Sequence, residues 1–293
     1  MIFFPGLHHP SDARFFKFAC ISINRLWRRR LKIPRKTLVL VDSGAFTVLD
    51  KLGFYPESHS VERYAFRLWQ MYTSGLLTII AAVAQDYMCE PRITAKTGLA
   101  ILDHQRLTIE RYDALIAELR RLFRGAIPFH VMPVLQGQSE ADYLRHMEMY
   151  GDRLRPGMWV GVGSVCKRQG DPAAVEGILR AIKRQRPDLW LHGFGVKLLA
   201  LMFAAIRRHL ASADSMAWSF AAKKVAARLI GQLMKELGLY KLLPSAARSI
   251  LAARGVKLPD ANDWREAKAF ARQVRRPATR PEEPEQLQLD LAA

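Results

Sequence analysis

The segment TLVLVDSGAF, at residues 37–46, places a short run of Val and Leu directly before Asp42, Ser43 and Gly44. Runs of this length and composition are typical of strands buried on both faces of a parallel sheet. Five further segments share this form: LTIIAAVAQD (77–86), HVMPVLQGQ (130–138), WVGVGS (159–164), WLHGFG (190–195) and ASADSMAWS (211–219). Barrels and doubly wound sheets build their active sites at the carboxyl ends of such strands. We therefore expect these polar ends to meet.

Helical patterns alternate with these runs. The apolar spacing predicts helices near 60–73, 103–123, 172–185 and 197–209, and Ser139 starts a capping box ahead of a further helix. The apolar start at residues 2–4 makes a seventh strand. An eighth strand is not placed, because the chain after residue 219 turns strongly helical. The pattern predicts an α/β fold, best described as an incomplete or altered (β/α)8 TIM-type barrel.

The chain length and composition bound the domain organisation. With 293 residues, half of them hydrophobic, the chain can bury one large core. We expect a catalytic barrel at 1–220, a basic helical extension at 221–276 and a disordered tail at 277–293, which is rich in proline and charge.

Membrane and metal sites are not expected. No apolar run reaches the roughly 18 residues that a membrane helix needs, and the amino terminus lacks the order of a signal peptide, so a cytoplasmic protein is predicted. Cys20, Cys89 and Cys166 lie far apart and form no zinc-binding pattern. We expect reduced thiols, no metal and no cofactor.

The net charge of +18 is large for a cytoplasmic enzyme and indicates a polyanionic partner. Seven basic residues and Trp27 lie within residues 25–36, and a second basic region runs from 223 to 276. Solvated helix faces would account for part of this excess but not all of it. The residues expected to contact nucleic acid are Arg25, Arg28, Arg29, Arg30, Lys32, Lys223 and Lys224.

Four polar side chains at the expected strand ends could carry chemistry. Asp42, Asp86 and Asp214 are carboxylates, and Gln136 supplies an amide. Two carboxylates that face each other across a sugar can break a glycosidic bond, with one attacking the anomeric carbon and the other handling protons. A third carboxylate with an amide could hold a guanine-like base. The alternative is that each Asp only caps the helix that follows it.

Six motifs, taken in order, resemble the strand-end motifs of queuine/archaeosine tRNA-guanine transglycosylases: VDSGAF (41–46), AQDYMCEP (84–91), VLQGQ (134–138), VGVGS (160–164), HGFG (192–195) and SADSMAW (212–218). GLHHPSDA (6–13) and ISINRLWRRR (21–30) look more like one branch, the DpdA-type DNA 7-deazaguanine transglycosylases. The resemblance spans residues 6 to 220. It implies a barrel enzyme that exchanges guanine for a free 7-deazaguanine base, with no other cofactor.

The resemblance also implies roles for individual residues. Asp214 aligns with the nucleophile that forms a covalent glycosyl-enzyme intermediate, and Asp42 aligns with the general acid/base. Asp86 and Gln136 align with residues that read the edge of the base. A main-chain amide near Gly161 or Gly163 would contact the base carbonyl. The remaining residues expected to line the substrate site are Ser43, Gly44, His192, Gly193 and Gly195.

The sequence departs from the tRNA enzymes in two places. Those enzymes carry a zinc site of three cysteines and a histidine after the nucleophile, whereas no cysteine follows Cys166 here. DNA is therefore the expected substrate, with a tRNA transglycosylase and a non-catalytic nucleic-acid-binding barrel as alternatives. Ser164 follows the glycine-rich strand where bacterial tRNA enzymes have a glutamate, which favours a neutral 7-cyano substituent on the base.

Two further expectations concern the biological setting. In this family, base exchange shields DNA from restriction nucleases and often occurs in phage genomes, so the host cytoplasm would be its location. The tail segment QLQLDL, Gln286 to Leu291, resembles the short peptide by which bacterial proteins dock onto the replication sliding clamp.

Overall fold

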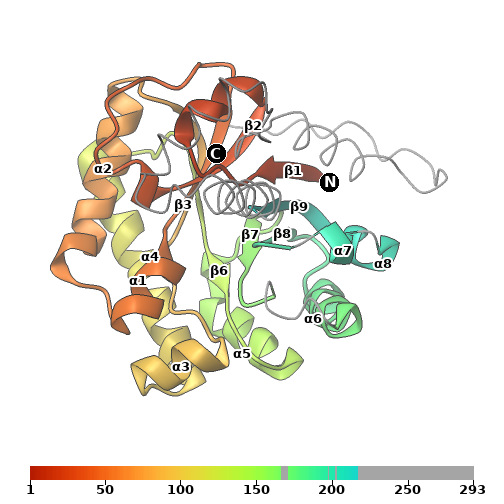
Figure 1. Cartoon of the computed structure of the whole chain (residues 1–293). Coiled ribbons are helices and arrows are strands. Elements are labelled where there is room, and N and C mark those ends of the chain that lie inside the picture. The colour runs from red at the N-terminus through yellow and green to blue at the C-terminus, as the bar shows by residue number, and fades with distance from the viewer. Residues whose placement is uncertain (166–170, 197, 202, 217–293) are drawn as a thin grey trace, which may run out of the picture.

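The computed structural model describes residues 1–216 apart from 166–170, 197 and 202. Within this part of the chain, parallel strands alternate with helices, and the helices lie outside the strands (Figure 1). The α/β class is confirmed. The strands are β1 (Ile2–Pro5), β2 (Phe18–Ser22), β3 (Leu38–Asp42), β4 (Thr78–Val83), β5 (His130–Met132), β6 (Val134–Leu135), β7 (Trp159–Val162), β8 (Trp190–Gly193) and β9 (Leu210–Ser215).

The helices follow the strands along the chain, and most of the expected ones are present. The α-helices are α1 (Ala45–Leu52), α2 (Val61–Thr73), α3 (Pro91–Thr97), α4 (Ile101–Phe123), α5 (Glu140–Tyr150), α6 (Pro172–Gln185), α7 (Leu198–Leu201) and α8 (Ala204–Arg207). Short 3-10 turns are η1 (Pro10–Phe15), η2 (Ile23–Arg25), η3 (Glu57–His59) and η4 (Gly151–Arg153).

Side-chain caps explain where two of the predicted helices begin. The Ser60 hydroxyl accepts a hydrogen bond from the Arg63 N–H, 3.3 Å away, at the start of α2. At α5 the predicted capping box is complete: Ser139 Oγ accepts from the Asp142 N–H, and Asp142 Oδ2 accepts from the Ser139 N–H. These bonds satisfy backbone donors that the first turn of a helix leaves without partners.

The strands form two sheets in which every neighbouring pair is parallel. The orders are β1-β9-β8-β7-β6 and β2-β3-β4-β5. Two features connect the sheets: β5 and β6 flank Pro133 in one continuous segment, and a bridge between Gly6 and Cys20 links the segment after β1 to β2. The Leu7 N–H also donates to the Cys20 carbonyl at 2.9 Å.

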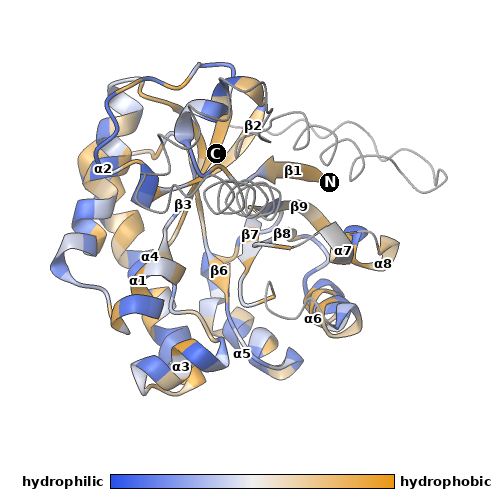
Figure 2. Ribbon diagram, viewed as in Figure 1, coloured by the Kyte–Doolittle hydropathy of each residue, from blue (hydrophilic) through white to orange (hydrophobic). Residues whose placement is uncertain are grey.

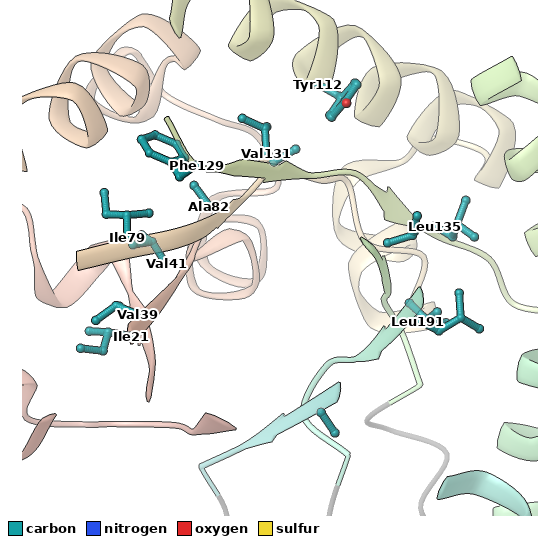
Figure 3. Close-up of a cluster of buried hydrophobic side chains, with 14 of the residues drawn as sticks. Ile21, Val39, Val41, Ile79, Ala82, Tyr112, Phe129, Val131, Leu135 and Leu191 are labelled. Atoms are coloured by element: carbon teal, nitrogen blue, oxygen red, sulfur yellow. The ribbon is translucent and has the colours of Figure 1, made fainter. Parts of the chain in front are cut away.

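Successive residues of a strand enter two different hydrophobic clusters. Val39 and Val41 of β3 pack in the larger cluster between strands and helices (Figure 3), whereas Leu40 packs in a second cluster. Both faces of the strands are therefore buried, as the continuous apolar runs predict. The orange of β1 and β6 contrasts with the mixed colours of the helices, which have one face toward solvent (Figure 2). The second cluster consists of Phe4, Cys20, Leu40, Ala81, Val83, Met132 and Val134.

Several elements differ from the sequence-based prediction. The strand Phe18–Ser22 was not predicted, because the basic run that follows it dominates the local pattern. No helix was predicted where α1 and α3 lie. The predicted helix at 197–209 is divided into α7 and α8.

The predicted extension at 221–276 and tail at 277–293, with its clamp-like segment, lie outside the described residues. Within the described part of the chain, none of the helices combines the length and the hydrophobicity that crossing a membrane requires. Cys20 and Cys89 are free and buried. Cys166 is not among the described residues.

Candidate active site

The structure brings the predicted polar residues to the carboxyl ends of the strands. Asp42 is the last residue of β3, Asp86 follows β4, Gln136 follows β6, and Asp214 lies near the end of β9. Asp86, Gln136 and Asp214 are buried, and Asp42 is half-buried. Because parallel strands end at the same edge, four distant parts of the sequence supply one site.

Asp42 combines burial with a nearby like charge. Burial, together with the nearby charge of Asp214, raises the pKa of the Asp42 carboxyl to about 6. Hydrogen bonds from the Gly44 N–H, 3.1 Å from Asp42 Oδ2, and from the Ser22 side chain act in the opposite direction. A carboxyl group with this pKa can both give and accept a proton near neutral pH.

Gly44 has a specific structural reason to be glycine. Its φ of 73° lies in the left-handed region, and a Cβ at this position would overlap the side-chain amide of Asn24. That amide donates a hydrogen bond to the Gly44 carbonyl at 3.3 Å. The turn after Asp42 is therefore tied to the segment after β2.

Asp214 accepts two hydrogen bonds on the same carboxylate oxygen. The Gly195 N–H donates to Asp214 Oδ1 at 2.9 Å, and His192 Nε2 lies 3.3 Å from that oxygen. Gly195 has a φ of 60°, a conformation that favours glycine and that presents its N–H to the carboxylate. Two of the residues predicted from the HGFG motif thus contact the predicted nucleophile.

Asp86 and Gln136 contact each other directly. Gln136 Nε2 donates to Asp86 Oδ2. Gln136 Oε1 accepts from Ser164 Oγ at 2.6 Å and from the Cys89 N–H at 3.4 Å, which fixes which end of the amide is the donor. Burial, together with the charges of Asp42 and Glu90, raises the pKa of the Asp86 carboxyl to about 7, although the hydrogen bond from Gln136 lowers it.

The two strand glycines are engaged in the sheet. The N–H groups of Gly161 and Gly163 donate to the carbonyls of Pro133 and Leu135, each at 2.9 Å. A Cβ at Gly163 would overlap the Gln136 amide, so this glycine leaves room for the side chain beside it. Their predicted contact with a base carbonyl stays a prediction.

Ser43 and Gly193 complete the predicted lining residues. Ser43 Oγ is buried and has no hydrogen-bond partner among the described residues. A buried hydroxyl without a partner is costly, which makes it a candidate to bind a ligand. A Cβ at Gly193 would lie 2.7 Å from the Val196 side chain, so this glycine is required for close packing.

The first basic segment begins beside the site. It starts in η2, directly after β2, and Asn24 of this turn is hydrogen-bonded to the turn after Asp42. Arg25, Arg28, Arg30 and Lys32 are exposed, whereas Arg29 is half-buried. Lys223 and Lys224 lie outside the described residues.

The sequence patterns indicated no role for three side chains that contact the acidic residues directly or through one or two neighbours. Ser22 bonds to Asp42, Ser212 bonds to His192, and Trp159 bonds to Ser212. Ser22 could have been found as the polar residue that ends the strand FACIS. Ser212 and Trp159 lie within strands, so no strand-end pattern would have selected them.

Metal binding is not supported by the part of the chain that is described. No group of three or more His, Cys, Asp and Glu residues there is arranged to hold a metal ion. The expectation that the protein uses neither metal nor cofactor stays a prediction.

The fold and the site define an α/β protein of parallel strands that gathers three aspartates and an amide at the strand ends, beside a basic segment. The chain belongs to the DpdA family, DeoxyPurine in DNA protein A, whose model matches residues 1–265. This family is linked to the modification of DNA with deazapurines. No curated protein matches the chain.

Replacing Asp86 with Asn should change how stability depends on pH. The folded-state pKa of about 7 lies above the ordinary value of 3.8, so folding favours the protonated form. The stabilising contribution is complete below about pH 4 and is lost as the pH rises through about 7. The free energy of unfolding of Asp86→Asn relative to wild type should therefore rise by about 4 kcal/mol between pH 4 and pH 8.

Urea unfolding at a series of pH values measures this difference. Asp188→Asn is the matched control, because the hydrogen bond from Arg186 lowers the pKa of Asp188 to about 2 and its titration falls below this window. A pH-independent difference between Asp86→Asn and wild type would contradict the prediction.

Proposed function

We propose that this protein is a DNA-guanine transglycosylase, which exchanges guanine in DNA for a 7-deazaguanine base through a covalent glycosyl-enzyme intermediate. The observation that carries the proposal is the unequal pair of carboxyl groups. Asp42 has a pKa of about 6, which the charge of Asp214 helps to raise. Asp214 accepts two hydrogen bonds on one oxygen. One group is suited to move protons and the other to attack.

In the first proposed step, a carboxylate oxygen of Asp214 attacks C1′ of the target deoxyguanosine. The C1′–N9 bond breaks, its electron pair leaves with guanine, and Asp42 in its acid form donates a proton to the departing base. In the second step, the incoming base gives its N9 proton to Asp42 and attacks C1′, which expels Asp214. Two inversions give net retention, and the exchange needs no external energy source.

Asp86 and Gln136 are proposed to recognise the base. In the structure they are buried neighbours that satisfy each other. The carboxylate of Asp86 can accept from the N–H groups of a guanine-like base, and the Gln136 amide can donate to a carbonyl. The orphan hydroxyl of Ser43, beside Asp42, offers a further contact to the substrate.

We also propose that the two sheets are parts of one closed (β/α)8-type barrel, with β5 and β6 as a single strand interrupted at Pro133. The bridge from Gly6 to Cys20 supports closure at the other junction. The second hydrophobic cluster, which contains Leu40, supports it too, because its members come from strands of both sheets. The unpredicted strand Phe18–Ser22 would then be the eighth strand.

DNA is the proposed substrate because the basic segment starts at the same edge as the acidic residues. The exposed Arg25, Arg28, Arg30 and Lys32 can neutralise backbone phosphates while the target nucleotide is turned out of the duplex toward Asp214. Family membership supports the same substrate, since the family is linked to DNA modification.

Mass spectrometry of nucleosides tests this function. Cells that express the chain and have a supply of 7-deazaguanine precursors should contain a modified deoxyribonucleoside, and cells that express Asp214→Asn should not. DNA and tRNA are digested separately. A modified ribonucleoside alone would indicate a tRNA enzyme, and the absence of both would favour a binding protein without this activity.

The base substituent is proposed to be the neutral nitrile of 7-cyano-7-deazaguanine. Ser164 stands after the glycine-rich strand, and its hydroxyl is committed to Gln136 Oε1. An ammonium group on the base would have no carboxylate at this position. In a competition between the cyano and aminomethyl bases at equal concentration, we expect the cyano base to be incorporated in excess. Equal incorporation of the aminomethyl base would contradict this, and a preference for it would point to the buried Glu90.

A further inference from the structure

A chain of three hydrogen bonds reaches Asp214 through the protein interior. Trp159 Nε1–H donates to Ser212 Oγ at 2.8 Å, Ser212 Oγ lies 2.8 Å from His192 Nδ1, and His192 Nε2 lies 3.3 Å from Asp214 Oδ1. His192 and Ser212 are buried, and Trp159 is partly buried. The three residues come from β7, β9 and β8.

The chemical nature of each group determines which partner donates in each hydrogen bond of this chain, which we call the relay. The indole nitrogen of Trp159 can only donate, so Ser212 Oγ accepts from it. A carboxylate can only accept, so His192 Nε2 must carry a hydrogen toward Asp214. In a neutral imidazole the other nitrogen, Nδ1, is then an acceptor, and it takes the hydroxyl hydrogen of Ser212. With a neutral imidazole, this arrangement satisfies every partner.

The surroundings hold the imidazole in place. The rings of Phe4, Trp159 and Phe194 contact the His192 ring at centroid separations of 6.0, 5.9 and 4.7 Å, all edge-to-face. Trp159 therefore serves twice, as a packing partner of the ring and as the first donor of the relay. The His192 side chain is fully buried among these rings.

Both hydrogen bonds to Asp214 converge on one oxygen. Among the described residues, Gly195 N–H and His192 Nε2–H donate to Oδ1, and none donates to Oδ2. The oxygen that accepts two hydrogen bonds is the weaker nucleophile, because its lone pairs are engaged. The lone pairs of Oδ2 therefore remain available to attack C1′.

We infer that His192, held by Ser212 and Trp159, is a positioning residue that selects Oδ2 of Asp214 as the attacking atom. This inference rests on the proposed function. In the second step the Asp214 carboxylate is the leaving group, and the N–H groups of His192 and Gly195 stabilise the charge that returns to it. In this role His192 holds the carboxylate in place and transfers no proton.

Three variants test the inference through exchange kinetics with labelled 7-deazaguanine. His192→Leu should lower kcat about 100-fold with the KM for DNA unchanged, because one preorganised donor is lost at the reacting group. His192→Gln should recover activity to within about 10-fold of wild type, since its amide N–H extends to the position of Nε2. Ser212→Ala should lower kcat about 10-fold, because the tautomer is no longer enforced.

His130→Gln is the matched control. His130 stacks on Trp159 at 6.0 Å and bonds to its carbonyl, but among the described residues no hydrogen bond joins it to Asp214, so its loss should leave kcat unchanged. Thermal unfolding of each variant monitors folding. If His192→Leu and His192→Gln lowered kcat equally, or if His130→Gln lowered kcat as much as His192→Leu, the effect would come from packing. The inference would then be wrong.

A measurement without activity separates this inference from the proposed function. Nitrogen-15 NMR of the histidine rings distinguishes the two neutral tautomers. The wild-type spectrum should show His192 with hydrogen on Nε2, and Ser212→Ala should show a mixture. Hydrogen on Nδ1 in the wild type would show that the inferred direction of these hydrogen bonds is wrong, even if base exchange occurs. The expected tautomer in a protein that exchanges no base would mean that the proposed function alone has failed.

Discussion

Replacing Asp214 with Asn is expected to reduce base exchange by about 10⁴-fold or more while leaving DNA binding within about twofold of wild type. An amide oxygen is a poor nucleophile, so no covalent intermediate can form. The shape of the side chain is kept, and its Oδ1 can still accept from the Gly195 N–H, which is 2.9 Å away in the wild type. Exchange of labelled guanine into DNA and fluorescence anisotropy measure the two properties.

Asp171→Asn is the matched control for this experiment. Asp171 caps helix α6 by accepting from the Ala174 N–H at 3.0 Å, and Asn is an equally good cap. This variant should exchange guanine at the wild-type rate. Measurable exchange by Asp214→Asn at a rate near that of Asp171→Asn would remove Asp214 from the nucleophile role.

Replacing Asp42 with Asn is expected to slow turnover by about 10²- to 10⁴-fold, the usual contribution of a general acid/base. The amide can neither protonate departing guanine nor take the proton from the incoming base. If the second step becomes the slower one, a covalent adduct between protein and DNA accumulates. Denaturing gel electrophoresis detects the adduct, and steady-state kinetics measure the rate.

The pH dependence of kcat/KM tests whether this effect comes from the Asp42 carboxyl group itself. The pKa of about 6 means that kcat/KM for DNA should fall as the pH rises through about 6, because the ionised group has no proton to give. Ser22→Ala removes a hydrogen bond that lowers the pKa, so this fall should move to higher pH. An unchanged rate in Asp42→Asn, or a wild-type profile that is flat in this range, would contradict the assignment.

The sequence pattern predicted the parts of the fold that depend on local periodicity. The run before Asp42 is a buried strand because both of its faces are apolar, and the helix after Ser139 begins where its capping box predicts. The strand Phe18–Ser22 was not predicted, because it has only five residues and the long basic run after it dominates the local composition. Strand pairing depends on distant residues, so the division into two sheets could not be read from any local segment.

The candidate site was predictable to the extent that strand ends define it. Asp42 and Asp214 were selected because polar residues follow apolar runs, and in the structure the charge of Asp214 raises the pKa of Asp42. Ser212 and Trp159 could not be selected in this way, since they lie inside strands and matter only through their contacts with His192 and with each other. The direct pairing of Asp86 with Gln136 likewise depends on side-chain orientations that periodicity does not encode.

The main-chain donor at Gly195 has a consequence for how the site tolerates mutation. One of the two hydrogen bonds to Asp214 comes from a side chain and can be lost in a single substitution, whereas the other comes from the backbone. A backbone N–H persists through any side-chain change that preserves the φ of 60° at this glycine. A substitution at position 192 can therefore remove one of the two hydrogen bonds to Asp214, but the one from Gly195 stays in place.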